Sequence, residues 1–363
     1  MMPMKRTVLV ILLITATVRF TPAVIAQTEE SVDLYALYQE IDDAISQSPQ
    51  YVAKREAQID ACRDSLLKEK QLEERVALAE HLFQLFQSYK NDSALYYAEV
   101  CISLADSLHR PDIAGRYRSL MAYQCSNTNM YSEAFEQLRL VHKPALDQAG
   151  LVDYYSAWMH VYGELASYTQ FKDKRRSYFD LQNLYRDSVM MVAQEGSEEW
   201  LHLKVDILCA TRSFQDALSI SNRWLKKVTP DTHESAYAAF YRSMVYDQLR
   251  NHDMTRYWLG RSALDDIKCA VMNQASLLFL ADHLANDGDI TRARRYMEFA
   301  RECNEEFCPH LRIYQVDPYI HVLEKSCEAA QAKVRQTLII AAVVLIPLLL
   351  MLFVIIIRKK KQK

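Results

Sequence analysis

The chain has 363 residues, of which 50% are hydrophobic and 25% charged, and its formal net charge is −3. Its 6 glycines and 9 prolines make up about 4% of the chain, against roughly 12% in an average protein. So few turn-forming residues exclude a many-stranded sandwich, barrel or propeller, and also a glycine-loop nucleotide fold. The abundance of Leu, Ala, Glu, Gln, Arg and Tyr predicts an all-α protein with long helices and short joints.

Residues 1–26 have the pattern of a secretory signal peptide. Lys5 and Arg6 precede the apolar run Thr7–Val18, and Ala26 precedes an expected cleavage at Gln27. Twelve residues of helix rise about 18 Å, which is short of the roughly 30 Å of a bilayer core. We therefore expect export and cleavage, with an uncleaved anchor as the alternative.

Residues 27–71 are expected to form N-terminal helices that cap the following array. Two helices, 32–47 and 51–70, are predicted because Ser48-Pro49 interrupts the helical pattern.

Residues 72–309 contain an internal repeat. A small residue recurs together with the residues four and seven positions later; these positions lie on one helical face, and small residues there let a neighbouring helix approach closely. The six sets are Ala94/Ala98/Cys101, Ala134/Leu138/Val141, Ser177/Leu181/Leu184, Ala217/Ser221/Trp224, Arg256/Gly260/Ala263 and Ala293/Met297/Ala300. Their first members lie 40, 43, 40, 39 and 37 residues apart. Each set follows a short polar joint that is itself preceded by an amphipathic stretch, so the pattern predicts about six helix pairs.

These units resemble the tetratricopeptide repeat (TPR). The best matches are Phe214–Ile220, Met130–Leu138 and Ile290–Ala300, which carry an aromatic or apolar residue, an alanine and then a bulky residue. The period is nearer 40 than the usual 34, and Arg256 stands where alanine is expected. The resemblance implies a TPR-like α-solenoid that buries apolar faces only between neighbouring repeats.

The C-terminal region is predicted to contain a closing helix or linker at 310–336, a single transmembrane helix at 337–357 and a basic cytoplasmic stub at 358–363. Leu338–Ile357 is a run of 20 residues without a charge or a hydrogen-bonding side chain, about 30 Å long as helix, with Pro347 inside it. The basic cluster that follows, Arg358–Lys361 and Lys363, predicts that the stub is cytoplasmic and the repeat domain periplasmic. We also expect this helix to contact membrane lipid.

The charge is unevenly distributed along the chain. Residues 1–26 and 334–363 hold nine of the 43 Lys and Arg and none of the 46 Asp and Glu, so residues 27–333 carry a net charge of −12. Such a surface repels phosphate backbones, and nucleic-acid binding by this chain is not expected.

The eight cysteines lie at 62, 101, 125, 209, 269, 303, 308 and 327. Most lie in apolar helical stretches and are predicted to be buried thiols, although export leaves room for one or two disulfides.

No motif for catalysis or cofactor binding is present, so the chain is not expected to be an enzyme, and no catalytic, cofactor-binding or metal-binding residue is predicted. Asn286–Asp289 resembles a calcium loop, but positions one and twelve would be His283 and Arg294, so we interpret the segment as a repeat joint. Cys303, Cys308 and His310 could be imagined around zinc, yet a fourth ligand is missing nearby.

Two aromatic groups are the best candidates for a binding surface, although packing between repeats explains most aromatic residues in solenoids. One group is Tyr154, Tyr155, Trp158 and Tyr162, and the other is Tyr237, Phe240, Tyr241 and Tyr246. First helices of TPR pairs line the concave groove, where a protein or peptide, or a glycan, would bind. No individual binding residue is predicted.

A closer resemblance is carried by Asp33-Leu34-Tyr35, Tyr51–Glu56 and Asp92–Ala98. These segments are similar to those of membrane-spanning TPR regulators of the Bacteroidales type. That family combines a signal peptide, a periplasmic repeat domain and one membrane helix with a cytoplasmic coiled coil and a helix-turn-helix, and the last two are not found here. The resemblance implies a ligand-sensing or protein-interaction module at the inner membrane that is linked to transcriptional or envelope regulation. The alternatives are a non-signalling scaffold for an envelope complex and an enzyme with dispersed residues.

Overall fold

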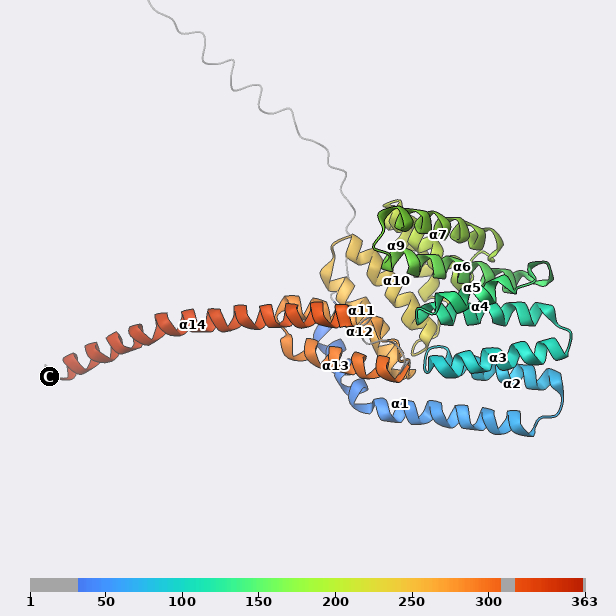
Figure 1. The fold of residues 1–363 in the computed structure, drawn as a ribbon. Helices are drawn as coiled ribbons and strands as arrows, with labels where there is room; N and C mark the ends of the chain where they lie inside the picture. The colour runs from blue at the N-terminus through green and yellow to red at the C-terminus, as the bar shows by residue number, and fades with distance from the viewer. Residues whose placement is uncertain (1–31, 308–316, 362–363) are drawn as a thin grey trace, which may run out of the picture. The chain divides into compact units, whose positions relative to one another are not determined.

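The computed structural model describes residues 32–307 and 317–361, and all regular secondary structure within these ranges is helical (Figure 1). The all-α prediction is confirmed, whereas the predicted signal peptide lies outside the described residues. The helices are α1 (Leu34–Lys68), α2 (Leu72–Phe86), α3 (Asn91–Ser107), α4 (Pro111–Asn127), α5 (Tyr131–Arg139), η1 (Lys143–Ala145), α6 (Gln148–Tyr168), α7 (Lys172–Val192), α8 (Glu198–Ala210), α9 (Phe214–Leu225), α10 (His233–Gln248), α11 (His252–Lys268), α12 (Ala275–Asp287), α13 (Ile290–Phe307) and α14 (Asp317–Lys361).

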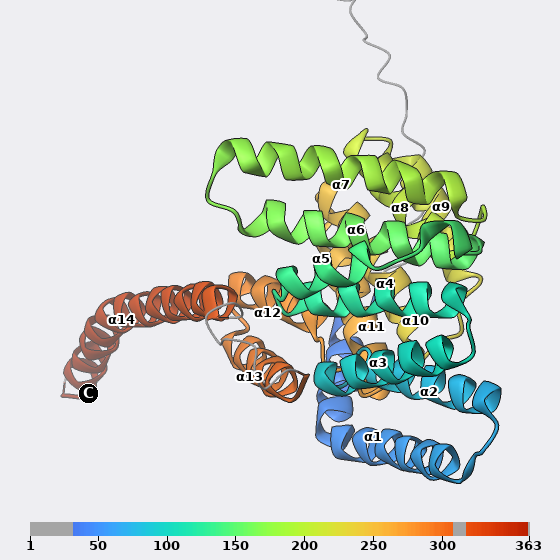
Figure 2. The same cartoon turned by 45° about the vertical axis from the view of Figure 1, so that its right-hand side comes forward.

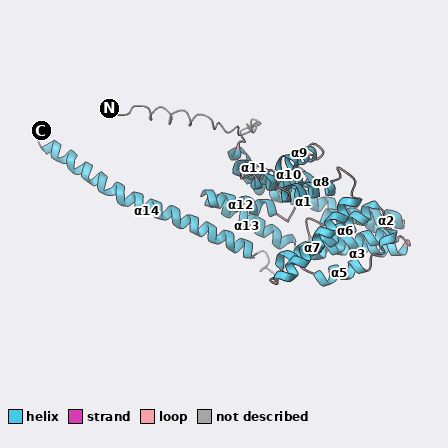
Figure 3. Ribbon diagram, turned by 90° about the horizontal axis from the view of Figure 1, so that it is seen from above, coloured by secondary structure: helices cyan, strands magenta, loops and turns pink. Residues whose placement is uncertain are grey.

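Helices α2 to α13 form six consecutive pairs, and the first helix of each pair also contacts a neighbouring pair (Figures 1 and 3). The predicted TPR-like solenoid of about six helix pairs is therefore confirmed. The predicted packing positions explain the close stacking, because Ala94, Ala98 and Cys101 in α3 are fully buried, and so are Ala217 and Ser221 in α9. Small side chains at these positions leave room for the facing helix.

Helix α7 packs in a different register from the predicted one. Ser177 is exposed and Leu184 is 59% exposed, so the expectation that they form the packing face is wrong. The face instead contains Tyr178, Tyr185 and Val189, and Val189 is completely buried. The two tyrosines stack on aromatic rings of α6, and these large rings decide the register in place of small residues.

The second pair is also shorter than expected. Helix α5 ends at Arg139, so Val141 lies beyond it, in the connection that leads through η1 to α6. Ala134 and Leu138, the other two members of the predicted set, lie within α5 and are buried.

The joints between helices use residues in the left-handed backbone conformation. His109, Asn129, Arg212 and Arg250 have φ between 53° and 61°, and in each case the next helix begins two residues later. Gly288, with φ of 93°, ends α12 in the same way. This confirms that Asn286–Asp289 is a repeat joint, since the turn fixes the exit angle of the chain.

Helix α1 is continuous over 35 residues with Pro49 inside it, so the predicted break into two helices is wrong. Proline removes one backbone hydrogen bond of a helix and strains the preceding turn. The two halves of α1 nevertheless stay aligned because each packs on its own core. Leu37 and Ile41 belong to a core formed with α11, α12 and α13, whereas Ile59 and Cys62 belong to a core formed with α2 and α3.

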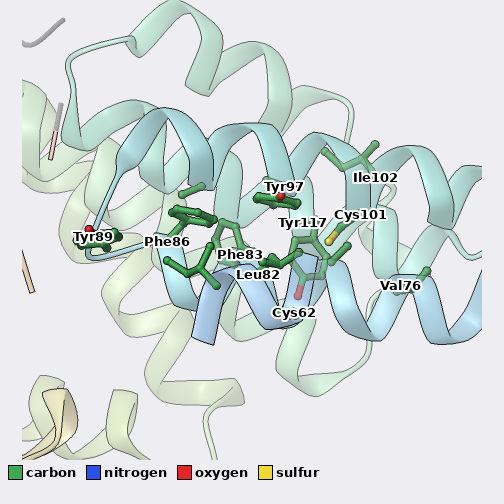
Figure 4. Packing of buried hydrophobic residues seen from close by; sticks show 14 of the residues in the cluster. Cys62, Val76, Leu82, Phe83, Phe86, Tyr89, Tyr97, Cys101, Ile102 and Tyr117 are labelled. Atoms are coloured by element: carbon green, nitrogen blue, oxygen red, sulfur yellow. The ribbon is translucent and has the colours of Figure 1, made fainter. Parts of the chain in front are cut away.

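The repeat array closes on itself through α1, contrary to the expectation that apolar faces are buried only between neighbouring repeats (Figure 2). Figure 4 shows the core around α2 and α3. The same core also includes Met272 from the connection between α11 and α12, and Cys303 and Phe307 from α13. Within it, the rings of Phe86 and Tyr97 stack with centroids 5.5 Å apart. First and last helix pairs thus share one buried cluster.

Arg55, near the middle of α1, joins the first helix pair of the array to the fifth by hydrogen bonds. Its guanidinium donates to the carbonyl oxygen of Leu85 at 2.6 and 3.0 Å and to that of Cys269 at 2.7 Å. Next to it, the Met272 amide donates to the Ser88 carbonyl oxygen at 2.9 Å. The ends of α2 and α11 are therefore held together by a cation at the negative ends of two helix dipoles.

Helix α14 is the one helix among the described residues that is long and apolar enough to cross a membrane, by length and composition. The qualifying segment is Gln331–Leu349, which is not buried against the rest of the chain and overlaps the predicted span at 337–357. Its apolar side chains are exposed, as Val343 at 65% and Leu345 at 56% illustrate. The helix also contacts α12 and α13.

The six cysteines for which the structure describes a side chain are free thiols. Four of them, Cys62, Cys101, Cys125 and Cys303, are buried, as most cysteines were predicted to be. Cys308 lies outside the described residues, and nothing is described of the Cys327 side chain.

Candidate functional site

The first helices of four successive pairs, α4, α6, α8 and α10, carry aromatic, histidine and acidic side chains, and rings contact one another between α4 and α6 and between α8 and α10. Tyr123 on α4 and Tyr237 on α10 are not on adjacent helices, yet the Tyr237 phenol helps to raise the pKa of Tyr123. Tyr123 in turn raises the pKa of Tyr241. The phenols of α4 and α10 thus influence each other electrostatically although the two helices are not neighbours in the chain. We call this surface the inner face and define it by Tyr123, His160, Glu164, Glu198, His202, Asp206, Tyr237 and Tyr241.

His160 is held against Tyr123 in a fixed orientation. The two ring centroids are 4.0 Å apart, and Nδ1 of His160 lies 2.7 Å from Oγ of Ser126. The Ser126 hydroxyl donates its proton to the Tyr123 carbonyl oxygen at 2.8 Å, so the imidazole is the donor in the bond to Ser126. Burial lowers the pKa of His160 to about 4. The ring is therefore neutral at pH 7, and its Nε2 is available as a hydrogen-bond acceptor.

His202 occupies an equivalent position two helices further on. Its ring centroid lies 5.7 Å from that of Tyr237 and 5.1 Å from that of Tyr241, and the two phenol oxygens are 3.4 Å apart. Trp224, which is fully buried, supports both tyrosines from behind with centroids 5.8 and 5.7 Å away. Burial lowers the pKa of His202 to about 4 as well.

Three carboxylates complete the inner face. Burial raises the pKa of Glu164 and of Asp206, and Arg186 offsets part of the rise for Asp206. Burial and the neighbouring Glu199 and Glu234 raise the pKa of Glu198 to about 7. In the described part of the chain none of these three carboxylates has an ion pair. The inner face therefore offers ring faces, hydroxyl groups and weakly acidic carboxyls, which are groups suited to contact with a ligand.

Of the two aromatic groups predicted as binding candidates, some members pack between helices and others belong to the inner face. Trp158 and Tyr162 stack on Tyr185 of α7 with centroids 5.4 and 5.8 Å apart, so most of the first group holds a helix pair together. In the second group Tyr246 is buried beside Arg242. Phe240 packs on the α11–α13 core. Tyr237 and Tyr241 are the two that reach the inner face.

The histidines and carboxylates of the inner face were not predicted from the sequence. They do carry a signal, because His160/Glu164 and His202/Asp206 are i, i+4 pairs at corresponding places in successive first helices, and Tyr237/Tyr241 is a further i, i+4 pair in the next one. Such pairs lie on one side of a helix.

The remaining candidate features give no stronger site. A pocket of about 570 Å³ between α3, α4 and α5 is lined by Ser103, Asp106, Arg118 and Gln137 among others, and it opens widely to solvent. Within the described ranges no group of three His, Cys, Asp or Glu side chains could hold a metal ion. Cys303 is buried, whereas Cys308 and His310 lie outside the described residues.

The six helix pairs define a TPR-type helical-repeat protein, and this fold typically serves as a protein-interaction scaffold without enzymatic activity. The family model described as the SusR N-terminal TPR domain matches residues 45–318, which is more than half of the chain, and the chain belongs to this family. No curated protein matches the chain.

Proposed function

We propose that the protein is a membrane-anchored periplasmic sensing module of a Bacteroidales-type TPR regulator. In this proposal residues 1–26 are removed as a signal peptide, residues 27–309 form the periplasmic domain, and α14 crosses the inner membrane once with its basic end in the cytoplasm. The family match supports the regulator assignment, and the exposed apolar surface of α14 supports the anchor. The acidic domain and the basic terminal cluster favour the stated orientation.

The observation that carries the proposal is the inner face. A TPR domain binds protein partners, and rigid tyrosine rings beside unpaired carboxyls supply both contact area and orientation for an extended peptide segment. Binding there biases the relative positions of successive pairs, because the inner face draws residues from four of them. Binding of the partner would in this way signal its presence in the periplasm without any chemical reaction.

The proposal is tested by replacing carboxylates of the inner face with amides of the same shape. We expect the double variant Glu164→Gln, Asp206→Asn to change the transcript levels of a defined set of genes in the same direction as deletion of the protein. Asp216→Asn, at an exposed position on α9, is the matched control. If deletion of the protein alters envelope assembly but no transcript levels, the non-signalling scaffold is favoured instead.

A further inference from the structure

The first half of α1 connects parts of the chain that are far apart in sequence. Residues 34–47, which we call the strap, contribute Leu37, Tyr38, Ile41 and Ala44 to the core of α11, α12 and α13. From Val52 onwards, the apolar residues of α1 instead pack with α2 and α3. The strap thus contacts helices more than 200 residues away and closes the array.

The seat of the strap is shaped by small residues. Gly260 of α11 lies so close that an added Cβ would come within 2.7 Å of Leu37 and 3.3 Å of Ile41. Ala263, Ala293 and Ala300 line the same seat and are buried. A methyl group at position 260 has no free space, since Leu37 is only 4% exposed.

Polar contacts fix the rim of the seat. Arg292 and Arg295 of α13 both pair with Asp42 at 3.2 Å, and Arg295 donates to Oγ of Ser46 at 3.0 Å. The Tyr296 hydroxyl donates to the Tyr38 carbonyl oxygen at 3.2 Å. These contacts give the strap one register without adding much apolar burial.

A weak point separates the strap from the rest of α1. Pro49 has no amide hydrogen, so the helical hydrogen bond to the Ile45 carbonyl cannot form. Arg55 lies beyond this point and holds α1 to the ends of α2 and α11. Release of the strap would therefore leave the second half of α1 in place.

We propose that the strap is a releasable closing element of the helical array, which detaches at Pro49 while the remainder of α1 stays docked. Its seat lies on α11, α12 and α13, and α14 contacts two of these three helices. Release and docking of the strap thus change the packing of the helices that lead into the apolar helix. This inference concerns the fold and does not depend on what the inner face binds.

Hydrogen exchange of the full chain in lipid nanodiscs tests the proposal. In the wild-type protein we expect amides of residues 37–47 to exchange at least about tenfold faster than those of residues 59–66, because the strap opens below the energy of global unfolding. Equal rates in the two halves would show that α1 opens as one unit and would overturn the proposal.

Gly260→Ala provides the matched perturbation. We expect it to speed exchange of residues 37–47 by a further factor of about ten and to leave α2 to α9 unchanged. In a Leu37→Ala background, Gly260→Ala should add little, because the side chain that it meets has been removed. Gly163→Ala is the control, since its Cβ meets the flexible Gln182 side chain between α6 and α7. A uniform rise across all helices in Gly260→Ala would contradict a local release.

Discussion

The two histidines of the inner face illustrate how burial sets the chemistry of a single residue. Burial lowers the pKa of both His160 and His202 to about 4. Both rings therefore present neutral donor and acceptor groups at pH 7. Glu198, with a pKa of about 7, is only partly ionised there. The inner face carries less charge at neutral pH than its composition suggests.

These histidines make folding stability depend on pH. Their folded pKa lies below the unfolded value of about 6.5, so their contribution is fully present above that pH and is lost as the pH falls towards 4. When the pH falls from 7 to 5, we expect each histidine to lower the free energy of unfolding by about 1 kcal/mol, allowing for its partial solvent exposure. Urea unfolding at both pH values measures the loss. The double variant His160→Gln, His202→Gln should lose less stability over this interval, and an equal loss would contradict the assignment.

Arg55 is the residue on which closure depends most directly. Arg55→Met leaves the Leu85 and Cys269 carbonyl oxygens without their donor, and we expect a loss of about 2–4 kcal/mol in the free energy of unfolding. Lys54→Met removes a charge from an exposed neighbour on the same helix and should change stability by less than about 0.5 kcal/mol. Chemical denaturation compares the two variants, and similar midpoints would show that the contacts of Arg55 are dispensable.

At the scale of the helix, sequence periodicity predicts the helix pairs well, but it predicts less reliably which face of a helix packs against its neighbours. The sets in α3, α9 and α13 were predicted correctly because one small-residue face dominates each helix. In α7 the tyrosines at 178 and 185 compete with Ser177, and only the rings of α6 decide between the two faces. Helix α1 was predicted to break at Pro49 because the contacts that keep it straight come from residues more than 200 positions away.

The turns between helices contain avoidable strain. Arg212 adopts φ of 59° while its amide donates to the Cys209 carbonyl oxygen at 2.9 Å. A side chain in this conformation costs roughly 1 kcal/mol relative to glycine. We therefore expect Arg212→Gly to raise the free energy of unfolding by about 1 kcal/mol, as measured by thermal denaturation.

The matched control for the turn lies in the next helix. Arg223→Gly, at an exposed position within α9, should lower stability by about 1 kcal/mol, because glycine is a poor helix former. Two replacements of arginine by glycine in one repeat are thus expected to change the free energy of unfolding in opposite directions. Destabilisation by both would mean that the left-handed turn is not strained.

At the scale of the whole molecule, closure explains why the inner face could be predicted only in part. The tyrosines at 237 and 241 stand out in the sequence, and the i, i+4 pairs of α6 and α8 could be found by comparing repeats. The electrostatic influence of Tyr237 on Tyr123 depends on how several stacked pairs are arranged in space. That curvature accumulates from small rotations at each interface and has no local sequence signal.

Closure also makes the first and last helix pairs depend on each other. In an open solenoid each pair contacts only its neighbours, and the end pairs are the first to fray. Here Met272 and Phe307 share a core with Phe83 and Tyr97, so both ends are covered. A perturbation at either end therefore reaches α12 and α13, which also contact α14.

The last prediction concerns the anchor itself. Val343 and Ile346 lie in the apolar part of α14 and are 65% and 56% exposed, so no other described part of the chain covers them. An arginine at the centre of a membrane helix costs about 2.5–3.5 kcal/mol. We expect the double variant Val343→Arg, Ile346→Arg to leave the membrane pellet after an alkaline wash, whereas the wild-type protein stays in it. Gln331→Arg with Ala332→Arg adds the same charges near the end of the apolar segment, where long side chains reach the interface, and should remain in the pellet. If the variant with the central arginines also stays in the pellet, then α14 is not the element that holds the protein at the membrane.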